Sequence, residues 1–512
     1  MSGDYSRKRF NPEKHYQGVL RQQGRVDLDA DWNEYVDLQD RRWRAETIDV
    51  VGRSGVPDET PDGFKIAVSG GELTVGQGRM YVDGYVAENH GTAPAFEPTL
   101  EEGYGTAALP VKNQPYGGPV TVPAQVRSLV YLDVWRREVT HLQAPDLIEP
   151  AVNVDSTTRH QTAWQVRVLA NIPPDITCDT PLSDIPGWPT GNRSSSARLT
   201  TTTVAVTTEP DPCLVPPTGG YRGLENHLYR VEVHSATTTT AKVKWSRENA
   251  HVATSLLEIL AGRTTVRVES LGRDDVLRIK TGDWVELTSD QREFAGLPGE
   301  MRKVTVDDAN QTLTFSPALP AADFPQGVVD AAKHVRVIRW DQSGIVRKPD
   351  GSQLINLDLT SDGLIELSAA NPSFVLELGV QATLTVLAGG TAHSGDYWCF
   401  AARTADADIE RLNQAPPLGI HHHHAHLAII EPNGEIHDCR TVFPPLTELT
   451  PGCCTVVVRP GEDIQAAIDS LPDEGGCVCL KVGDHEIQAP IRIEKSHVSL
   501  HGETLGARVV RT

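Results

Sequence analysis

The chain has 512 residues, of which 39% are hydrophobic and 22% are charged, and its formal net charge is −21. One hydrophobic core rarely organises a chain of this length, so we expect three or more domains. The negative charge argues against a nucleic-acid-binding protein and against attachment to an anionic membrane surface. No apolar run reaches the roughly 20 residues that span a bilayer. The N-terminus lacks the apolar core of a secretory signal peptide, so we expect synthesis in the cytoplasm.

Residues 1–55 begin with a basic and aromatic arm and continue into a polar helix. We expect Asp29 to cap the helix and Gly52 to end it. Trp32, Tyr35, Val36, Trp43 and Ile48 fall on one stripe at helical spacing. A basic aromatic arm before a half-apolar helix is typical of attachment to a larger body. The docking residues that we expect are Arg7, Lys8, Arg9, Phe10, Tyr16, Trp32, Tyr35 and Trp43.

Four segments carry a resemblance to a family of uncharacterised proteins associated with phage tails and phage-tail-like contractile injection particles. They are residues 16–34, 220–232 and 244–249, and residues 395–398 together with Arg403. The resemblance extends over most of residues 5–450. It implies a place on such a particle or virion, which also acts outside the cell after release, and it implies no catalytic residues.

The rest of the chain predicts a mainly β fold. Gly and Pro are frequent (43 and 35 residues), and segments rich in Thr and Val lie between them, which is typical of short strands joined by turns. We expect β-sandwich modules and one small SH3-like barrel. The predicted regions are a β domain at 56–170, its continuation at 171–270 with an exposed Pro/Ser/Thr-rich insertion at 171–220, the barrel at 271–345, a β domain with a histidine-rich strand at 346–450, and a different C-terminal module at 451–512.

In residues 451–512 a short helix, with Asp463 as its cap, precedes closely spaced short strands. This pattern resembles the capping helix and first coils of a right-handed parallel β-helix of the pectate-lyase-like kind. About three coils are required for a stable solenoid, and this stretch holds one or two. We therefore expect the module to dock on other chains or the natural gene to continue beyond Thr512.

The histidine-rich segment 421–426 is the most conspicuous candidate site. On a strand His422, His424 and His426 share one face, and His421, His423, Leu427 and Ile429 share the other. Three imidazoles at this spacing can bind Zn, Ni or Fe, and in a trimer they can form a six-imidazole site. The plainer interpretation, a strand edge hydrogen-bonded to its neighbours, is favoured. Apart from this metal we expect no cofactor.

The remaining candidate groups point to packing. Eight cysteines are too few for a disulfide scaffold. Cys453 and Cys454 with Cys477 and Cys479 have spacings that structural zinc sites disfavour, so we expect Cys477 and Cys479 in the core. The C-terminal carboxylates are scattered: Asp484, Glu486, Glu494 and Glu503.

The leading hypothesis is therefore a structural appendage, a tail fibre, spike or baseplate-associated protein. It docks through its N-terminus and presents its β-helix to a target surface. The expected partners are other particle subunits, two further copies in a homotrimer, and a cell-surface glycan. The alternatives are a polysaccharide lyase or hydrolase, and a carbohydrate-binding adhesin, each acting through the β-helix.

Overall fold

The computed structural model describes residues 3–69, 72–92, 107–114, 120, 122–123, 125–203, 220–445, 454–502 and 507–511. The chain is mainly β, which confirms the expected class. It divides into two compact units, one formed by Met1–Val56 with Asp62–Thr441 and the other by Pro57–Pro61 with Val442–Thr512. In the described part of the chain no helix is both long enough and apolar enough to cross a membrane.

The first unit begins with an arm, in which η1 (Pro12–Lys14) is one 3-10 turn, and with helix α1 (Asp29–Val51). Leu28 is the N-cap residue and makes no side-chain cap. Asp29 instead accepts hydrogen bonds from the backbone N and the Oγ of Ser6, at 2.8 and 2.6 Å. Because the carboxylate oxygens of Asp29 accept from Ser6 of the arm, the expectation that Asp29 caps the helix is wrong. Gly52 ends the helix as predicted, with φ 92° and its N–H donating to the Ile48 carbonyl at 2.9 Å.

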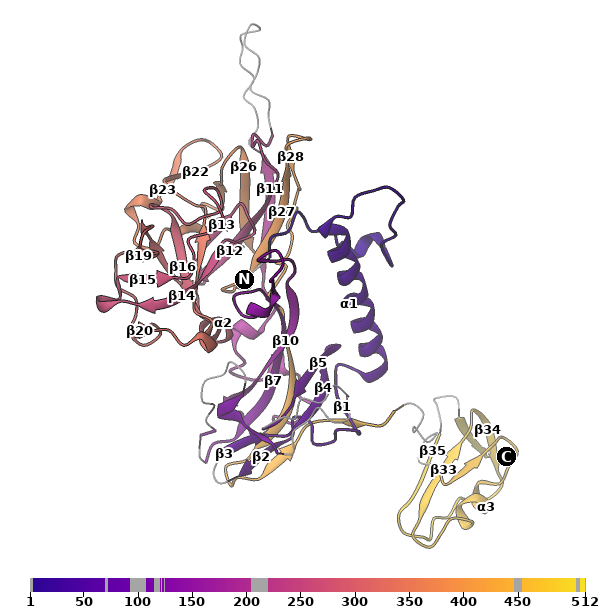
Figure 1. The fold of residues 1–512 in the computed structure, drawn as a ribbon. Coiled ribbons are helices and arrows are strands. Elements are labelled where there is room, and N and C mark those ends of the chain that lie inside the picture. Colours follow the sequence, from indigo (N-terminus) through magenta and orange to yellow (C-terminus); the bar gives the residue numbers. More distant parts are fainter. Residues whose placement is uncertain are drawn as a thin grey trace. The chain divides into compact units, whose positions relative to one another are not determined.

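Three sheets enclose one core below the arm (Figure 1). In the longest, β10 (Arg159–Ala170), β7 (Ser128–Val139), β29 (His422–Ile430) and β30 (Ile436–Asp438) lie in that order. The other two contain β1 (Ser54–Pro57), β4 (Gly78–Val82) and β5 (Tyr85–Asn89), and β2 (Ile66–Ser69), β3 (Glu72–Val75) and β6 (Leu109–Pro110). Because β29 pairs with β7, the predicted regions 56–170 and 346–450 both contribute strands to one sheet.

A β-sandwich follows, as expected. One layer has the strands β24 (Ile365–Ser368), β13 (Thr240–Ser246), β12 (His227–Ala236), β27 (Tyr397–Arg403) and β28 (Asp408–Ile409) in that order. The facing layer has β11 (Ala197–Thr203), β26 (Val380–Val386) and β25 (Ser373–Val375). Side chains from both layers fill one core, in which Tyr229, Phe374 and Phe400 are fully buried.

The barrel-like module is an eight-stranded antiparallel sheet. Its strands are β17 (Glu300–Lys303), β16 (Trp284–Thr288), β21 (Arg336–Trp340), β14 (Ala253–Ile259), β15 (Thr265–Val268), β19 (Thr312–Thr314), β18 (Thr305–Asp307) and β20 (Gly327–Val328). Helix α2 (Asp290–Phe294) follows β16 and is capped by the Oγ of Ser289. The module begins at Ala253 rather than at residue 271, because Leu256, Ile259 and Val266 complete its core.

The smaller elements among the described residues of this unit are two hairpins and seven 3-10 turns. The hairpins are β8 (Ile148–Glu149) with β9 (Val154–Asp155), and β22 (Ile345–Arg347) with β23 (Gln353–Asn356). The turns are η2 (Val111–Asn113), η3 (Pro145–Leu147), η4 (Leu182–Asp184), η5 (Thr190–Asn192), η6 (Ala261–Arg263), η7 (Ala331–Lys333) and η8 (Leu357–Leu359).

The stretch 171–203 is not the exposed insertion that its composition suggested. Ile172, Ile176, Ile185 and Trp188 are buried against Tyr131 of β7. A disulfide between Cys178 and Cys439, with the Cα atoms 5.2 Å apart, ties this stretch to the segment after β30. The expectation fails here because tertiary contacts supply the apolar partners that the local pattern lacks. Residues 204–219 of the predicted insertion lie outside the described residues.

The second unit contains β31 (Val442–Phe443), β32 (Val456–Val458), α3 (Ile464–Asp469), β33 (Gly476–Leu480), β34 (Gly483–Ile487), β35 (Val498–Gly502) and β36 (Ala507–Arg511). β32, β33 and β35 pair in parallel, and so do β34 and β36, as the coils of a parallel β-helix do. Asp463 caps α3 through hydrogen bonds to the backbone N of Gln465 and Ala466, as predicted. The likeness to pectate-lyase-like proteins stays a prediction.

Candidate functional site

The N-terminal arm is bound to its own chain. Gly3 N and the Tyr5 hydroxyl both donate to Glu138 Oε1 of β7 at 2.5 Å. The Asn249 side chain donates to the Gly3 carbonyl at 2.9 Å, and Arg403 Nη2 donates to the Ser6 carbonyl at 2.5 Å. Burial, and then the charge of Glu138, raise the pKa of Tyr5, so its hydroxyl stays protonated. The first residues of the arm are therefore part of the β body.

Three of the four segments that carried the resemblance form the surroundings of this arm. Asn249 and Arg403 hold Gly3 and Ser6. The segments 220–232 and 395–403 provide β12 and β27, which pair with each other, and Arg403 also donates to the His227 carbonyl at 3.1 Å. The motifs singled out in the sequence thus build the place where the arm binds.

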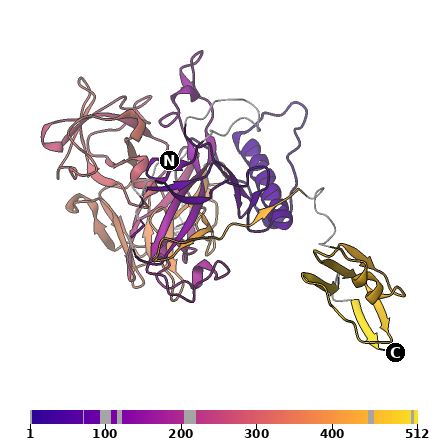
Figure 2. The same cartoon turned by 90° about the horizontal axis from the view of Figure 1, so that it is seen from below.

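Helix α1 turns its charged face, and not its aromatic one, toward the β body. Arg136 of β7 pairs with Asp40 at 3.0 Å and with Asp37 at 3.8 Å. The Arg44 guanidinium lies 4.0 Å from the centre of the Tyr85 ring. Both views draw α1 along the outside of the sheets (Figure 1, Figure 2). Within α1 only Ala30 and Leu38 are buried.

The aromatic side of α1 is left exposed. We define the outer stripe as Leu28, Trp32, Tyr35, Trp43 and Val50, which recur at helical spacing. Their exposed fractions are 45, 60, 39, 66 and 56%. Val36 and Ile48, which we expected on the same stripe, are half-buried and line a cavity that Trp32 also borders.

The cavity has a volume of about 1720 Å³ and is bounded by the arm, α1 and the β body of the first unit. Arg7, Lys8, Arg9 and Phe10 line it. Arg9 also forms an ion pair with Asp31 of α1. Tyr16 and Trp32 line the same cavity, and Arg7 and Lys8 remain exposed, so the docking role of the eight residues stays a prediction. Tyr16, at 56% exposure, together with Trp32, Tyr35 and Trp43, keeps the exposure that docking requires.

A cluster of buried charges forms part of the cavity wall, and we call Glu232, Lys244 and Glu286 the Lys244 cluster. Lys244 Nζ lies 3.1 Å from Glu232 Oε1 and also contacts Glu286 Oε2, while Trp340 Nε1 donates to Glu286 at 3.0 Å. Burial by itself disfavours the charged forms, but Lys244 outweighs it and holds the pKa of Glu286 well below its usual range. Gly299 is required beside this carboxylate, because a Cβ there would lie 2.4 Å from Glu286 Cγ.

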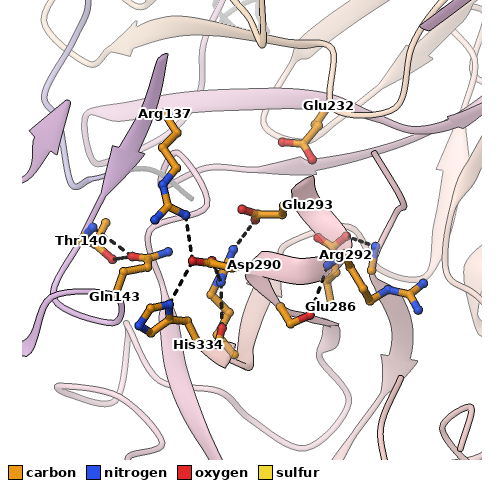
Figure 3. Close-up of polar contacts among 12 residues, drawn as sticks. Arg137, Thr140, Gln143, Glu232, Glu286, Asp290, Arg292, Glu293 and His334 are labelled. Atoms are coloured by element: carbon orange, nitrogen blue, oxygen red, sulfur yellow. Dashed lines mark hydrogen bonds and ion pairs between the residues drawn. The ribbon is translucent and has the colours of Figure 1, made fainter. Parts of the chain in front are cut away.

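A second buried cluster joins β7, α2 and β21. Asp290 accepts from Arg137 Nη1 and Arg336 Nη1, each at 2.8 Å, and lies 3.0 Å from His334 Nδ1. Figure 3 shows Arg137 and His334 pointing at the Asp290 carboxylate from opposite sides. We call these four residues the Asp290 cluster. Burial raises the pKa of Asp290, but Arg336 and Arg137 outweigh it, so the net shift is downward.

The structure separates the three histidines that we expected to act together. His422 Nδ1 lies 2.7 Å and His424 Nε2 3.4 Å from Asp133 Oδ1 on the paired strand β7. His426 does not join them in the described structure. His423 lies on the other face and contacts Asp83 at 3.0 Å, as the alternation predicted. A register shift after His426 places Ile429 in the core beside Tyr131, so the expectation that Leu427 and Ile429 share a face is wrong.

Asp133 was missed in the sequence, although it carried a signal. It is a carboxylate in the middle of the apolar run 128–135, and its side chain is fully buried. A buried carboxylate requires partners, and here they come from β10 and β29: Arg167 Nε lies 2.8 Å from its Oδ2. Among the described residues, His422, His424 and Asp133 are one of three groups whose ligand atoms are close enough to hold one metal ion, together with Asp4, Glu248 and His251, and with Cys454, Cys479 and His501.

In the second unit, Cys477 and Cys479 are buried as expected, at 4 and 1% exposure. The core side of β33 is formed by Val478 and Leu480. Cys477 and Cys479 lie on the opposite face, beside His501, with Sγ to ring nitrogen distances of 3.3 and 3.2 Å. Cys479 forms a disulfide with Cys454, which the sequence did not predict. Cys453 lies outside the described residues.

The C-terminal carboxylates remain scattered where they are described. Asp484 pairs with Arg508 of the neighbouring strand at 2.8 Å, and this contact joins β34 to β36. Glu503 lies outside the described residues. The expectation that none of these carboxylates is catalytic stays a prediction.

Comparison with known proteins gives one match. Residues 1–183 and 192–462 match the model of a protein family described as a family of unknown function (DUF6519). No curated protein and no solved structure matches the chain. The match includes the arm, α1 and all the strands of the first unit, together with the beginning of the second unit.

Proposed function

We propose that this chain, which belongs to the family of unknown function DUF6519, is a structural appendage of a phage tail or phage-tail-like contractile injection particle. It docks through α1 on a protein subunit of that particle. The observation that supports docking is the outer stripe, because a row of exposed aromatic side chains on one helix marks an interaction surface.

The charges of α1 favour a protein as the occupant over a membrane. The helix carries seven carboxylates and three arginines, whereas helices that lie on anionic membranes are rich in Lys and Arg on their polar face. A helix with an apolar stripe binds by placing that stripe in a groove of its partner. The partner that fits is therefore a particle subunit with an apolar groove rimmed by basic residues.

The charged face of α1 explains why the stripe remains available. Its ion pairs with Arg136 and the stacking of Arg44 on Tyr85 fix the helix on the β body. The binding of Gly3 and Ser6 by the body fixes the arm. The helix thus presents its aromatic face from a rigid base, which reduces the entropy lost on binding. The homotrimer and the glycan target stay predictions.

The test is co-sedimentation of the full chain with particles purified from the producing cells, with sheath and baseplate proteins identified by mass spectrometry. Replacing Trp32, Tyr35 and Trp43 together by Ser is expected to lower the bound fraction at least about 30-fold, because buried aromatic anchors contribute about 1–2 kcal/mol or more each. The matched control replaces three exposed apolar residues elsewhere, Leu224, Val328 and Leu359, by Ser.

The control variant is expected to co-sediment like the natural chain. Equal binding of the two triple variants would contradict docking through the outer stripe. If instead the aromatic variant changes only the mass of the free protein in light scattering, the stripe joins copies of this chain and the particle is not its partner.

A further inference from the structure

The histidine-rich strand contains a three-ligand arrangement that the docking function does not use. His422 and His424 of β29 lie opposite Trp135 and Asp133 of β7. Both imidazoles therefore reach the same carboxylate oxygen, Asp133 Oδ1, at 2.7 and 3.4 Å. All three ligand atoms lie within 4.8 Å of one another. Two ligands bound to one ion at the usual bond lengths of roughly 2.0–2.2 Å are up to about 4.4 Å apart. The distances from both imidazoles to Asp133 Oδ1 lie within that limit.

One atom of this group is buried without a hydrogen bond. The side chain of His424 is 8% exposed, and its Nε2 makes no hydrogen bond within the described structure. A buried polar atom without a partner is costly, so it marks a place where a ligand is expected. Burial lowers the pKa of His424 to about 4, which keeps its imidazole neutral and able to donate a lone pair.

The second oxygen of Asp133 lies in an ion pair. Arg167 Nε is 2.8 Å from Oδ2, although neither atom makes a hydrogen bond in the described structure, while Oδ1 lies beside the two histidines. The partner charges outweigh burial and lower the pKa of Asp133, so it is ionised at neutral pH. Metal-binding carboxylates and histidines are commonly oriented by such neighbours. Trp135 and Trp188 enclose the group, with ring centres 4.9 Å from His422 and 5.2 Å from His424.

We propose that Asp133, His422 and His424 bind one divalent transition-metal ion, of which Zn²⁺ is the probe that best fits two imidazoles and one carboxylate. His422 is 29% exposed, which gives the ion a path from solvent. His422 binds through Nδ1, the nitrogen that lies 2.7 Å from Asp133 Oδ1, as a neutral imidazole that carries its proton on Nε2. Hard cations such as Mg²⁺ prefer oxygen ligands and are excluded.

The experiment uses the full chain purified without a nickel column and treated with EDTA. Calorimetry with ZnCl₂ is expected to give one ion per chain, and MgCl₂ is expected to give no binding. Replacing His424 by Gln is expected to weaken Zn²⁺ binding more than about 100-fold, since even the loss of a supporting neighbour costs 10–100-fold. Because His424 is buried, His422→Gln provides a second variant at a more exposed ligand, with the same expected loss.

The strand offers matched controls for adventitious binding by a run of histidines. His426→Gln changes the next histidine on the same strand, and the double variant His421→Gln/His423→Gln changes the other face. Both are expected to bind Zn²⁺ like the natural chain. Loss of binding in the double variant with retention in His424→Gln and His422→Gln would overturn the proposal. The d–d absorption spectrum of Co²⁺ gives an independent measure of ligation, and an unchanged spectrum in His422→Gln would also count against it.

Discussion

Replacing Lys244 by Met is expected to lower the free energy of unfolding by about 3–5 kcal/mol, the usual effect of removing one partner of a buried ion pair. Lys244 is 2% exposed and lies between Glu232 and Glu286. Without its charge, Glu286 is left with His234 and Trp340 and Glu232 with Arg230, so each carboxylate loses the largest of the charges that offset its burial. Urea unfolding followed by tryptophan fluorescence measures the change, because Trp340 lies beside the Lys244 ammonium, 4.4 Å from its ring centre.

The same strand supplies the matched control. Lys242 lies two residues earlier on β13 and pairs with Asp362 at 2.5 Å, but both side chains are more than 30% exposed. Lys242→Met is expected to cost less than about 1 kcal/mol. Adding Glu286→Gln to Lys244→Met is expected to recover part of the lost free energy of unfolding, because the double variant also removes the buried Glu286 charge that Lys244 balanced. Equal effects at the two lysines would contradict the role of the Lys244 cluster.

Replacing Asp290 by Asn is expected to be nearly as damaging, at about 3 kcal/mol, because it leaves Arg336 and Arg137 with one fewer counter-charge in a buried place. Arg336 is 1% exposed. The effect also depends on pH. The pKa of folded Asp290 lies below its unfolded value of roughly 3.9, so its contribution is present above that value and is lost as the pH falls through the folded pKa.

Unfolding midpoints of the natural chain and of Asp290→Asn at neutral pH and at acidic pH measure both effects. The difference between them is expected to shrink as the pH falls below about 4. Asp358→Asn is the control, since Asp358 pairs with Lys303 at 2.7 Å but both side chains are more than 40% exposed. A difference that persists unchanged at acidic pH would show that Asp290 acts through its shape and not through its charge.

The histidine-rich strand β29 shows which structural features a local sequence pattern predicts and which it does not. The alternation of a strand correctly placed His422 and His424 on one face and His423 on the other. It gave no warning of the register shift after His426, because a bulge depends on the pairing strand. Asp133 was visible as a charge inside an apolar run, but its distance of 289 residues from His422 hid the contact.

The arm and α1 also combine features that the sequence predicted with features that tertiary contacts decided. Their composition correctly predicted a helix ending at Gly52 with exposed aromatic residues. Which face of the helix meets the body depended on Arg136 and Tyr85, which lie on strands far along the chain. The cavity that Arg7, Lys8, Arg9 and Phe10 line is likewise built by distant segments, and their expected docking role stays a prediction.

The amino-acid sequence by itself determined the mainly β class, the end of α1 at Gly52, the Asp463 cap of α3 and the alternation of the histidines. These features depend on neighbours within a few residues, whose spacing and capping chemistry are local. Only the tertiary structure decided that Lys244 meets Glu286, that His422 and His424 converge on Asp133, and that α1 turns its charged face inward. Those contacts require the order and register of strands, which a local pattern does not contain.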